Sequence, residues 1–330
     1  MIQIRKVTPL EGVHKITIPI PFPIEDVNVY LLEGSPLTLI DTGLRSTATM
    51  DALERALSGI GRKLRDVERI LVTHGHIDHF GAARTLSEIS GAKVFVHAFD
   101  VNKVNHDFLQ DFDREPSRLA LYLIEAGVPA NYYPFLKQEF LTNIHDYSEP
   151  LTRVELMADE DEIEAGGRKL QVMHFPGHCI GQVCFFDPEE QLMFTGDHVL
   201  PEITPNPVMD LIAREEFGYQ SLKTYLESLR STRNVDVRHT LPGHGEPFGP
   251  LQARVDEIIR HHEQRKNEIV RILNNGSKTK WQICGKLFSQ LEQREAFLGL
   301  SEVDGHLELL EEAGQVTCEK VKDSLLFHLH

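Results

Sequence analysis

The sequence is poor in cysteine and tryptophan. Its 330 residues include four cysteines and a single tryptophan. The cysteines form no Cys-x-x-Cys pair, which argues against a disulfide scaffold and against a zinc site of that spacing. We expect four reduced thiols in the protein core, at Cys179, Cys184, Cys284 and Cys318.

Basic residues and long apolar runs are also scarce. The 34 Lys and Arg are outnumbered by 50 Asp and Glu, which gives a formal net charge of -16. This balance argues against a broad nucleic-acid surface and favours small substrates. No apolar run reaches the roughly 18 residues of a membrane span, and the first residues lack the apolar core of a signal peptide. We therefore expect a cytoplasmic protein without a membrane partner.

Helical and strand patterns alternate in the first part of the chain, which predicts an α/β fold. Apolar residues with helical spacing at 47–60 precede a short β-branched run at 70–73, and a second helix and strand follow at 83–89 and 93–97. Strand patterns return at 169–174, 181–187 and 191–197. Between them, residues 100–140 are predicted to be helical, and we interpret this segment as an insertion that could serve as a lid.

The end of the chain predicts a smaller, second domain. A long charged helix at 251–273 is followed by helices at 279–290 and 303–313 and by two short strands, an order typical of a winged-helix-like module. We place the boundary near Pro250, with a larger first domain at 1–250 and a C-terminal domain at 251–330. The helix at 303–313 carries four acidic residues and no Lys or Arg, so we expect it to serve packing or homodimer formation rather than phosphate contact.

Histidine and aspartate residues are concentrated where the apolar strands end. Because several strand ends can meet at one sheet edge, we expect these side chains to converge. Imidazole and carboxylate groups together suit zinc and neighbouring first-row metals, whereas magnesium and calcium prefer oxygen ligands alone. The predicted metal ligands are His74, His76, Asp78, His79, His178, Asp197 and His244.

The motifs that contain these residues resemble those of the metallo-β-lactamase-fold superfamily. The matching segments are Asp41-Thr-Gly, Thr73-His-Gly-His-Ile-Asp-His, Pro176-Gly-His, Thr195-Gly-Asp and Pro242-Gly-His-Gly. The resemblance covers residues 10–248 and implies an αββα sandwich with metals at one edge between two sheets. It further implies one metal on His74, His76 and His178, a second on Asp78, His79 and His244, and Asp197 bridging them. Cys179 departs from the pattern, since relatives usually carry a small hydroxyl residue there.

The resemblance implies a hydrolase with two divalent metal ions, for which we expect zinc, with iron or manganese as alternatives. Two such metals can share a hydroxide and polarise a substrate carbonyl. Asp78 is the predicted catalytic residue, which would orient the hydroxide and receive its proton. Asp41 is expected to steady a ligand by a hydrogen bond, with a plain turn cap as the alternative, and His198 is a further candidate for such support.

The layout of the chain resembles the group that contains lactamase-β-like protein two and glyoxalase-II-like thioesterases. This group implies either thioester hydrolysis or cleavage of single-stranded RNA. The acidic charge and the apolar insertion favour a small acyl substrate, namely a thioester, ester or lactone. The local support for an endoribonuclease is a basic cluster of Lys278, Lys280 and Lys286 near Trp281.

Two further interpretations of the function remain open from the sequence. A mononuclear iron persulfide dioxygenase would not need the second ligand set, and a metal-free binding protein would be expected to lack some ligands. Histidines outside the cluster, namely His97 and His106, are given no ligand role. The pair His261-His262 on the long helix is interpreted as solvated surface, with inter-domain packing or pocket lining as the alternative.

Overall fold

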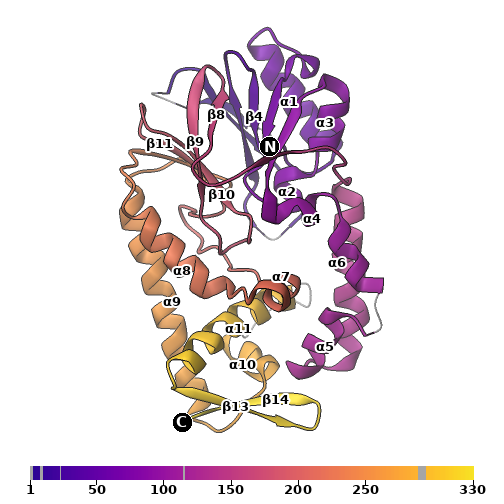
Figure 1. The fold of residues 1–330 in the computed structure, drawn as a ribbon, viewed down its shortest axis with the longest axis vertical. Coiled ribbons are helices and arrows are strands. Elements are labelled where there is room, and N and C mark those ends of the chain that lie inside the picture. Colours follow the sequence, from indigo (N-terminus) through magenta and orange to yellow (C-terminus); the bar gives the residue numbers. More distant parts are fainter. Residues whose placement is uncertain (1–2, 8–9, 23, 114–115, 289–294) are drawn as a thin grey trace.

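Two β-sheets stack face to face with helices on their outer sides, and a mainly helical part extends from one end of this sandwich (Figure 1). The structure is a computed structural model that describes residues 3–7, 10–22, 24–113, 116–288 and 295–330. The αββα fold class predicted from the sequence is confirmed. Among the described residues, no helix is long and apolar enough to cross a bilayer.

The first sheet has the strand order β1-β2-β3-β4-β5-β6-β7. Its antiparallel half runs from β1 to β4, and its parallel half from β4 to β7. Parallel neighbours need a crossover, which α1 (Thr47–Gly59) supplies between β4 and β5, α3 (Ala83–Ser90) between β5 and β6, and the helical insertion between β6 and β7. The strands are β1 (Gln3–Lys6), β2 (Val13–Ile18), β3 (Val27–Leu32), β4 (Thr38–Ile40), β5 (Arg69–Leu71), β6 (Lys93–His97) and β7 (Glu155–Met157).

The second sheet has the order β12-β11-β10-β9-β8. Its neighbours are antiparallel except β11 and β12, which are parallel and are joined through α7 (Leu211–Phe217) and α8 (Ser221–Thr232). The strands are β8 (Glu162–Ala165), β9 (Arg168–His174), β10 (Val183–Asp187), β11 (Leu192–Gly196) and β12 (His239–Pro242).

Three apolar layers hold the sandwich together. Between the sheets, Leu32 and Leu71 of the first sheet are fully buried against Val172 and Phe185 of the second. A separate cluster packs α1 and α3 on the outer face of the first sheet. A third cluster packs α8 and the first half of α9 (Leu251–Leu273) on the outer face of the second sheet. Burial on this scale stabilises the sandwich by about 25 cal/mol for each Å² of apolar surface removed from water.

The helical insertion and the C-terminal region share one hydrophobic core. Leu123 of α5 and Val128 are buried in the same cluster as Leu300 and Leu307 of α11. The insertion therefore packs against the C-terminal region, and both lie beyond the same end of the sandwich (Figure 1). The elements concerned are α4 (Val101–Val104), α5 (Arg118–Glu125), α6 (Tyr133–Tyr147), α10 (Lys280–Leu287), α11 (Ala296–Glu312), β13 (Val316–Val321) and β14 (Ser324–Leu329).

Several elements differ from their predicted bounds. The insertion runs on to Tyr147, and α11 begins at Ala296, seven residues before the predicted start at 303. Two glycines weaken the helical pattern of α11, but a Cβ at Gly305 would lie 2.6 Å from Leu222 Cβ of α8, so a glycine there permits close helix packing. The helix predicted at 279–290 ends at Leu287, and residues 289 and 290 lie outside the described residues. The short strands β7 and β8 and the helices α7 and α8 were not predicted.

The predicted boundary near Pro250 coincides with the start of α9 at Leu251. The helix itself serves both parts of the molecule, because Val255 and Ile258 pack on the second sheet while Ile269 and Leu273 pack in the C-terminal cluster. The division into two domains stays a prediction.

The cysteines are free thiols, as expected, but they are not all in the core. Cys179, Cys184 and Cys284 are buried, whereas Cys318 is exposed on β13. The prediction of core burial is wrong for Cys318, because the strand pattern around it could not show which side of the small hairpin faces solvent.

Candidate metal centre

The predicted metal ligands lie on loops at one edge of the sandwich. The first loop follows β5 and leads into α2 (Ile77–Phe80), a single helical turn that buries Asp78 and His79. His178 lies between β9 and β10, Asp197 directly follows β11, and His244 comes two residues after β12. Because each ligand is attached to the end of a buried strand, the two sheets together fix its position.

One group of three histidines converges closely. His76 Nδ1 lies 3.0 Å from His74 Nε2 and 2.9 Å from His178 Nε2. One ring nitrogen of each residue lies within 4.8 Å of the others, a spacing that could hold a metal ion. These residues are the ones that the family resemblance assigns to the first metal.

The second group consists of a carboxylate and two histidines. Asp78 Oδ2 lies 3.4 Å from His244 Nε2 and 3.8 Å from His79 Nε2. Asp197 lies between the two groups, since its Oδ1 is 3.4 Å from His79 Nε2 and its Oδ2 is 3.6 Å from His178 Nε2. The structure thus brings all seven predicted ligands together, with Asp197 where a bridging ligand would be needed.

Unpartnered polar atoms in this centre provide a test of whether metals fit it. Among the described residues, His79 Nε2, Asp197 Oδ1 and His244 Nε2 are buried and have no hydrogen-bond partner. Leaving such groups unpaired costs about 1–3 kcal/mol each, more when they are charged. A divalent cation coordinated by these nitrogens and oxygens would satisfy them. The residues therefore fit a pair of divalent metals.

Burial and charge set the protonation of the centre. Burial lowers the pKa of His74, and it lowers the pKa of His76 to about 3, so both rings keep free lone pairs. For Asp78, burial acts to raise the pKa, but the neighbouring His79 and His244 outweigh it and lower the pKa to about 2. A neutral imidazole and an ionised carboxylate are the forms that bind metals. For His79 and His244, burial acts to lower the pKa, but Asp197 and the other nearby carboxylates outweigh it. They raise the pKa of His79 and raise that of His244 to about 10, so a metal must displace a proton from these two rings.

Backbone and carboxylate oxygens fix three of the imidazole rings. Asp41 Oδ2 lies 2.8 Å from His79 Nδ1, and the same carboxylate accepts hydrogen bonds from the backbone N–H and the hydroxyl of Thr73. His178 Nδ1 lies 2.7 Å from the carbonyl oxygen of Asn206, and His244 Nδ1 lies 2.9 Å from that of Glu25. With Nδ1–H donating in each case, Nε2 is left to face the centre.

His198 lies behind the centre rather than in the pocket. Its ring is fully buried, stacks on Phe175 and has Nε2 2.6 Å from the hydroxyl of Thr232. The hydroxyl of Tyr225 donates to its carbonyl oxygen at 2.7 Å. His198 is therefore connected to the centre through the backbone that it shares with Asp197.

Gly243 allows the two sheets to meet at this edge. A Cβ at this position would lie 2.3 Å from Asp197 Oδ1 and 2.8 Å from His79 Cε1. Any side chain would therefore displace two of the predicted ligands. Glycine is needed at this position of the Pro-Gly-His motif because the backbone lies directly against the ligand side chains.

Sequence reasoning missed a second polar cluster beside the centre. Asp100 accepts hydrogen bonds from the backbone N–H groups of Gly75 and Gly181, so it ties two ligand-bearing loops together. Lys103 Nζ lies 3.0 Å from Cys179 Sγ and 3.0 Å from Asp210 Oδ2. The Cys179 thiol also lies 3.1 Å from Asp100 Oδ1. A hydroxyl side chain at position 179 could donate a hydrogen bond to the same oxygen. The sequence did not indicate this cluster because Asp100 and Lys103 belong to the insertion, and no local motif shows which residues the insertion contacts.

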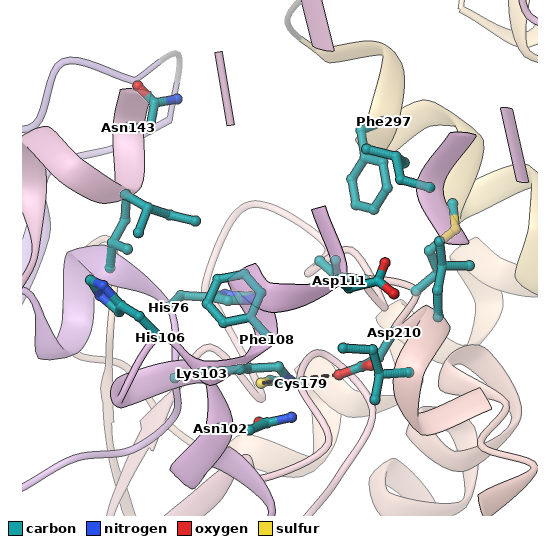
Figure 2. Close-up of a pocket in the computed structure, with 18 of the residues that line it drawn as sticks. His76, Asn102, Lys103, His106, Phe108, Asp111, Asn143, Cys179, Asp210 and Phe297 are labelled. Carbon is teal, nitrogen blue, oxygen red and sulfur yellow. Dashed lines mark hydrogen bonds and ion pairs between the residues drawn. The ribbon is translucent and has the colours of Figure 1, made fainter. Parts of the chain in front are cut away.

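A largely apolar pocket of about 410 Å³ opens onto the centre (Figure 2). His76, Asp78 and His178 line its inner end, with Lys103 and Cys179 beside them. Its walls come from three separate stretches of the chain: the insertion, the segment that leads into α7, and the start of α11. The apolar wall residues include Phe108, Leu119, Leu136, Ile144, Val208, Met209, Leu211, Phe297 and Leu298.

The fold and the ligand clusters together define a metal-dependent hydrolase. The chain belongs to the metallo-beta-lactamase superfamily, whose family model matches residues 23–244. The family resemblance inferred from the motifs is confirmed.

Four similar proteins each cover between 77% and 97% of this chain. "Probable metallo-hydrolase YqjP" of Bacillus subtilis is 29% identical over 93% of this chain and 94% of its own length. "Beta-lactamase-like protein 2 homolog" of Caenorhabditis elegans is 24% identical over 77% of this chain and 68% of its own. "Atrochrysone carboxyl ACP thioesterase" of Aspergillus fumigatus is 24% identical over 84% and 69%. The crystal structure of a metallo-beta-lactamase family protein from Thermus thermophilus has a TM-score of 0.84 and 28% identity, covering 97% of this chain and 99% of that one.

Proposed function

We propose that the protein hydrolyses acyl thioesters with two zinc ions as its cofactor. The observation that carries this proposal is the apolar pocket of about 410 Å³ that ends at the predicted metal ligands. A pocket of this size suits a small-molecule substrate whose apolar part is buried while its reacting carbonyl meets polar groups. Esters and lactones present the same carbonyl and are the neighbouring substrate classes.

The ligand roles follow the two clusters. His74, His76 and His178 would hold one metal, Asp78, His79 and His244 the other, and Asp197 both, in keeping with their proximity. When bound, the metals would supply an activated water nucleophile at neutral pH and polarise the thioester carbonyl. Nitrogen and carboxylate donors favour zinc, with iron or manganese as alternatives.

The chain's own residues would orient the reaction. Asp78 lines the pocket, and we assign it the role of orienting the attacking water and accepting its proton. Water would add to the carbonyl carbon and the carbon–sulfur bond would break, with the proton held by Asp78 passing to the leaving sulfur, so that the products are a carboxylic acid and a thiol. Asp41 would act as a positioning residue through His79 rather than by contact with the substrate.

The comparisons support a thioester more than RNA. The alignment with the thioesterase of Aspergillus fumigatus covers 84% of this chain.

The basic cluster that an RNA-binding surface would need is mostly engaged in other contacts. Lys280 is buried in an ion pair with Asp304, and Lys278 is buried with its amino group on the carbonyl oxygens of Asn275 and Gly276. Burying two of these three lysines argues against phosphate contact.

The second ligand set argues against a mononuclear iron dioxygenase. The potential ligand atoms of Asp78, His79 and His244 also lie within 4.8 Å of one another. A mononuclear centre would leave these buried groups without a partner. We also assign residues 1–250 to a catalytic domain and 251–330 to a winged-helix-like domain, in which an isolated β-bridge joins Lys278 to Phe327 of the hairpin β13–β14.

The test is a substrate panel with the purified, zinc-loaded chain. Acyl-CoA esters of increasing chain length, S-lactoylglutathione, a lactone and a short single-stranded RNA would be compared by kcat/KM, with bound metals quantified in the same sample. We expect about two zinc ions in the centre and thioester cleavage that improves with chain length until the pocket is filled. Cleavage of RNA alone, or one iron with oxygen consumption, would overturn the proposal.

A further inference from the structure

A second group of metal-binding side chains lies apart from the catalytic centre, between α9 and α11. His262 of α9 faces Glu302 and His306 of α11, and one potential ligand atom of each lies within 4.8 Å of the other two. The residues are 2%, 6% and 0% exposed. The interpretation of His262 as solvated surface is therefore wrong, and the alternative of packing between the two parts of the chain is correct.

Four polar side-chain atoms of this group have no hydrogen-bond partner among the described residues. Both ring nitrogens of His262, Oε1 of Glu302 and Nε2 of His306 are buried without a hydrogen bond. Buried polar groups are almost always satisfied, and each exception needs an explanation. Four unpartnered atoms at one place are more than a helix interface would tolerate for packing alone.

The geometry of the group is suited to a metal. Glu302 and His306 are four residues apart on α11 and so lie on one face of the helix. His306 Nδ1 lies 2.7 Å from the carbonyl oxygen of Glu302, which holds the tautomer that leaves Nε2 free, as metal-binding histidines usually require. His262 Nδ1 lies 3.8 Å from Glu302 Oε1. Ligand atoms around tetrahedral zinc are about 3.4 Å apart, so small side-chain rotations would close the site.

Arg265 is the competing partner for the carboxylate. Its Nε lies 3.6 Å from Glu302 Oε1, but both atoms remain without a hydrogen bond. The guanidinium also pairs with Glu268 and lies over the ring of Phe288, 4.9 Å from its centroid. Because Arg265 has these other partners, it does not account for the unpartnered atoms of the two histidines.

We propose that His262, Glu302 and His306 form a third, structural metal site that fastens α11 to α9. Two imidazoles and a carboxylate favour zinc or a neighbouring first-row metal, with a water or the second carboxylate oxygen completing the coordination. The site lies on the same helix as part of the pocket wall, because the start of α11 lines the pocket with Phe297 and Leu298. It contacts the catalytic part through Tyr225, whose ring lies 5.9 Å from that of His262. Its role would be to hold the C-terminal wall of the pocket in place.

Anomalous diffraction of the full-length, zinc-loaded protein tests the proposal without any substitution. Data collected on either side of the zinc absorption edge should give a peak between these three side chains, separate from the peaks of the catalytic centre. If the catalytic centre is occupied and this position shows only water or nothing, the site does not exist. Zinc at the third position with an empty catalytic centre would support this proposal while opposing the proposed function.

Metal counting on variants provides a second readout. Glu302→Gln and His306→Ala should each contain one metal equivalent less per chain than the wild type, with the catalytic metals retained. His261→Ala is the matched control, since His261 is the neighbour of His262 on α9 but lies outside the cluster. A folded His306→Ala or Glu302→Gln protein with the wild-type metal content would overturn the proposal, and the diffraction measurement decides the case if neither variant folds.

Discussion

The carboxylate of Asp41 lies 2.8 Å from Nδ1 of His79 and holds that ring toward the metal centre. Asp41 adopts a φ of 59°, a left-handed conformation that L residues other than Asn and Asp rarely take. Its side chain is anchored by two hydrogen bonds from Thr73, so the turn, the strand end and the ligand form one unit. The Asp-Thr-Gly motif therefore places a carboxylate against His79, and we propose that it supports the centre rather than serving as a plain turn.

Asp41→Asn tests this support. An amide cannot accept in the same way from both Thr73 and His79, so we expect metal affinity to fall by about 10–100-fold. The measurement is a competitive zinc titration against a chromogenic chelator. Asp51→Asn, on the exposed face of α1, is the matched control and should bind zinc as the wild type does. An unchanged titration for Asp41→Asn would show that the contact does not steady the ligand.

Asp78→Ala is expected to remove most of the hydrolytic activity. The loss of an acid–base group lowers the rate by about 10²–10⁴-fold, and the loss of a ligand adds to that effect. Activity on an acyl-CoA ester and metals per chain should be measured on the same preparation. Wild-type kcat with a full metal complement would contradict both roles assigned to Asp78.

Metal removal should abolish activity and lower thermal stability together. The chelated protein keeps buried, unpartnered atoms at His79, Asp197 and His244, so the metals stabilise the folded state as ligands do. A ligand at a thousand times its Kd contributes about 4 kcal/mol. Calorimetric Tm and thioester hydrolysis should both recover on addition of zinc. A chelated, metal-free protein that remains fully active would rule out metal-dependent catalysis.

Phe297→Ala should change the preference for acyl chain length. Removing a ring from the apolar wall reduces the surface that buries the acyl chain, so kcat/KM for the longest good substrate should fall by about tenfold or more while the shortest changes little. Leu156→Ala, at a side chain that is 63% exposed on β7, is the control. An equal loss for all chain lengths would mean that the wall serves folding instead of substrate binding.

Asp304→Ala should destabilise the C-terminal region strongly. Asp304 is 1% exposed and forms ion pairs with Arg214 of α7 and Lys280 of α10. Removing one member of a buried ion-pair network costs about 3–5 kcal/mol, because the remaining charges stay buried. The exposed pair of Glu312 with Lys223 provides the comparison, and Glu312→Gln should lower the free energy of unfolding far less, because solvent screens exposed ion pairs. Urea unfolding followed by circular dichroism gives both values.

The strand ends and their ligands were predictable because each signal is local. A buried strand followed directly by a histidine or aspartate identifies both the element and its ligand, as at Asp197 after β11. Asp100 and Lys103 could not be found this way, since their partners lie about 80 and 110 residues further along the chain, at Gly181 and Asp210. Within α11, Gly305 is explained only by its close contact with Leu222 of α8, about 80 residues earlier in the chain. The burial of His262 likewise depends on packing between two distant helices.

The walls of the pocket and the ligands at its inner end come from different stretches of the chain. The ligands are attached to strands that both sheets lock in position, whereas the walls belong to the insertion, the segment before α7 and the start of α11. Replacements in the walls leave the strands that carry the ligands unchanged. Substitutions in the pocket walls can therefore change the substrate while the metal ligands and the reaction stay the same. A mutant library that varies only the wall positions is the most direct way to change the substrate specificity.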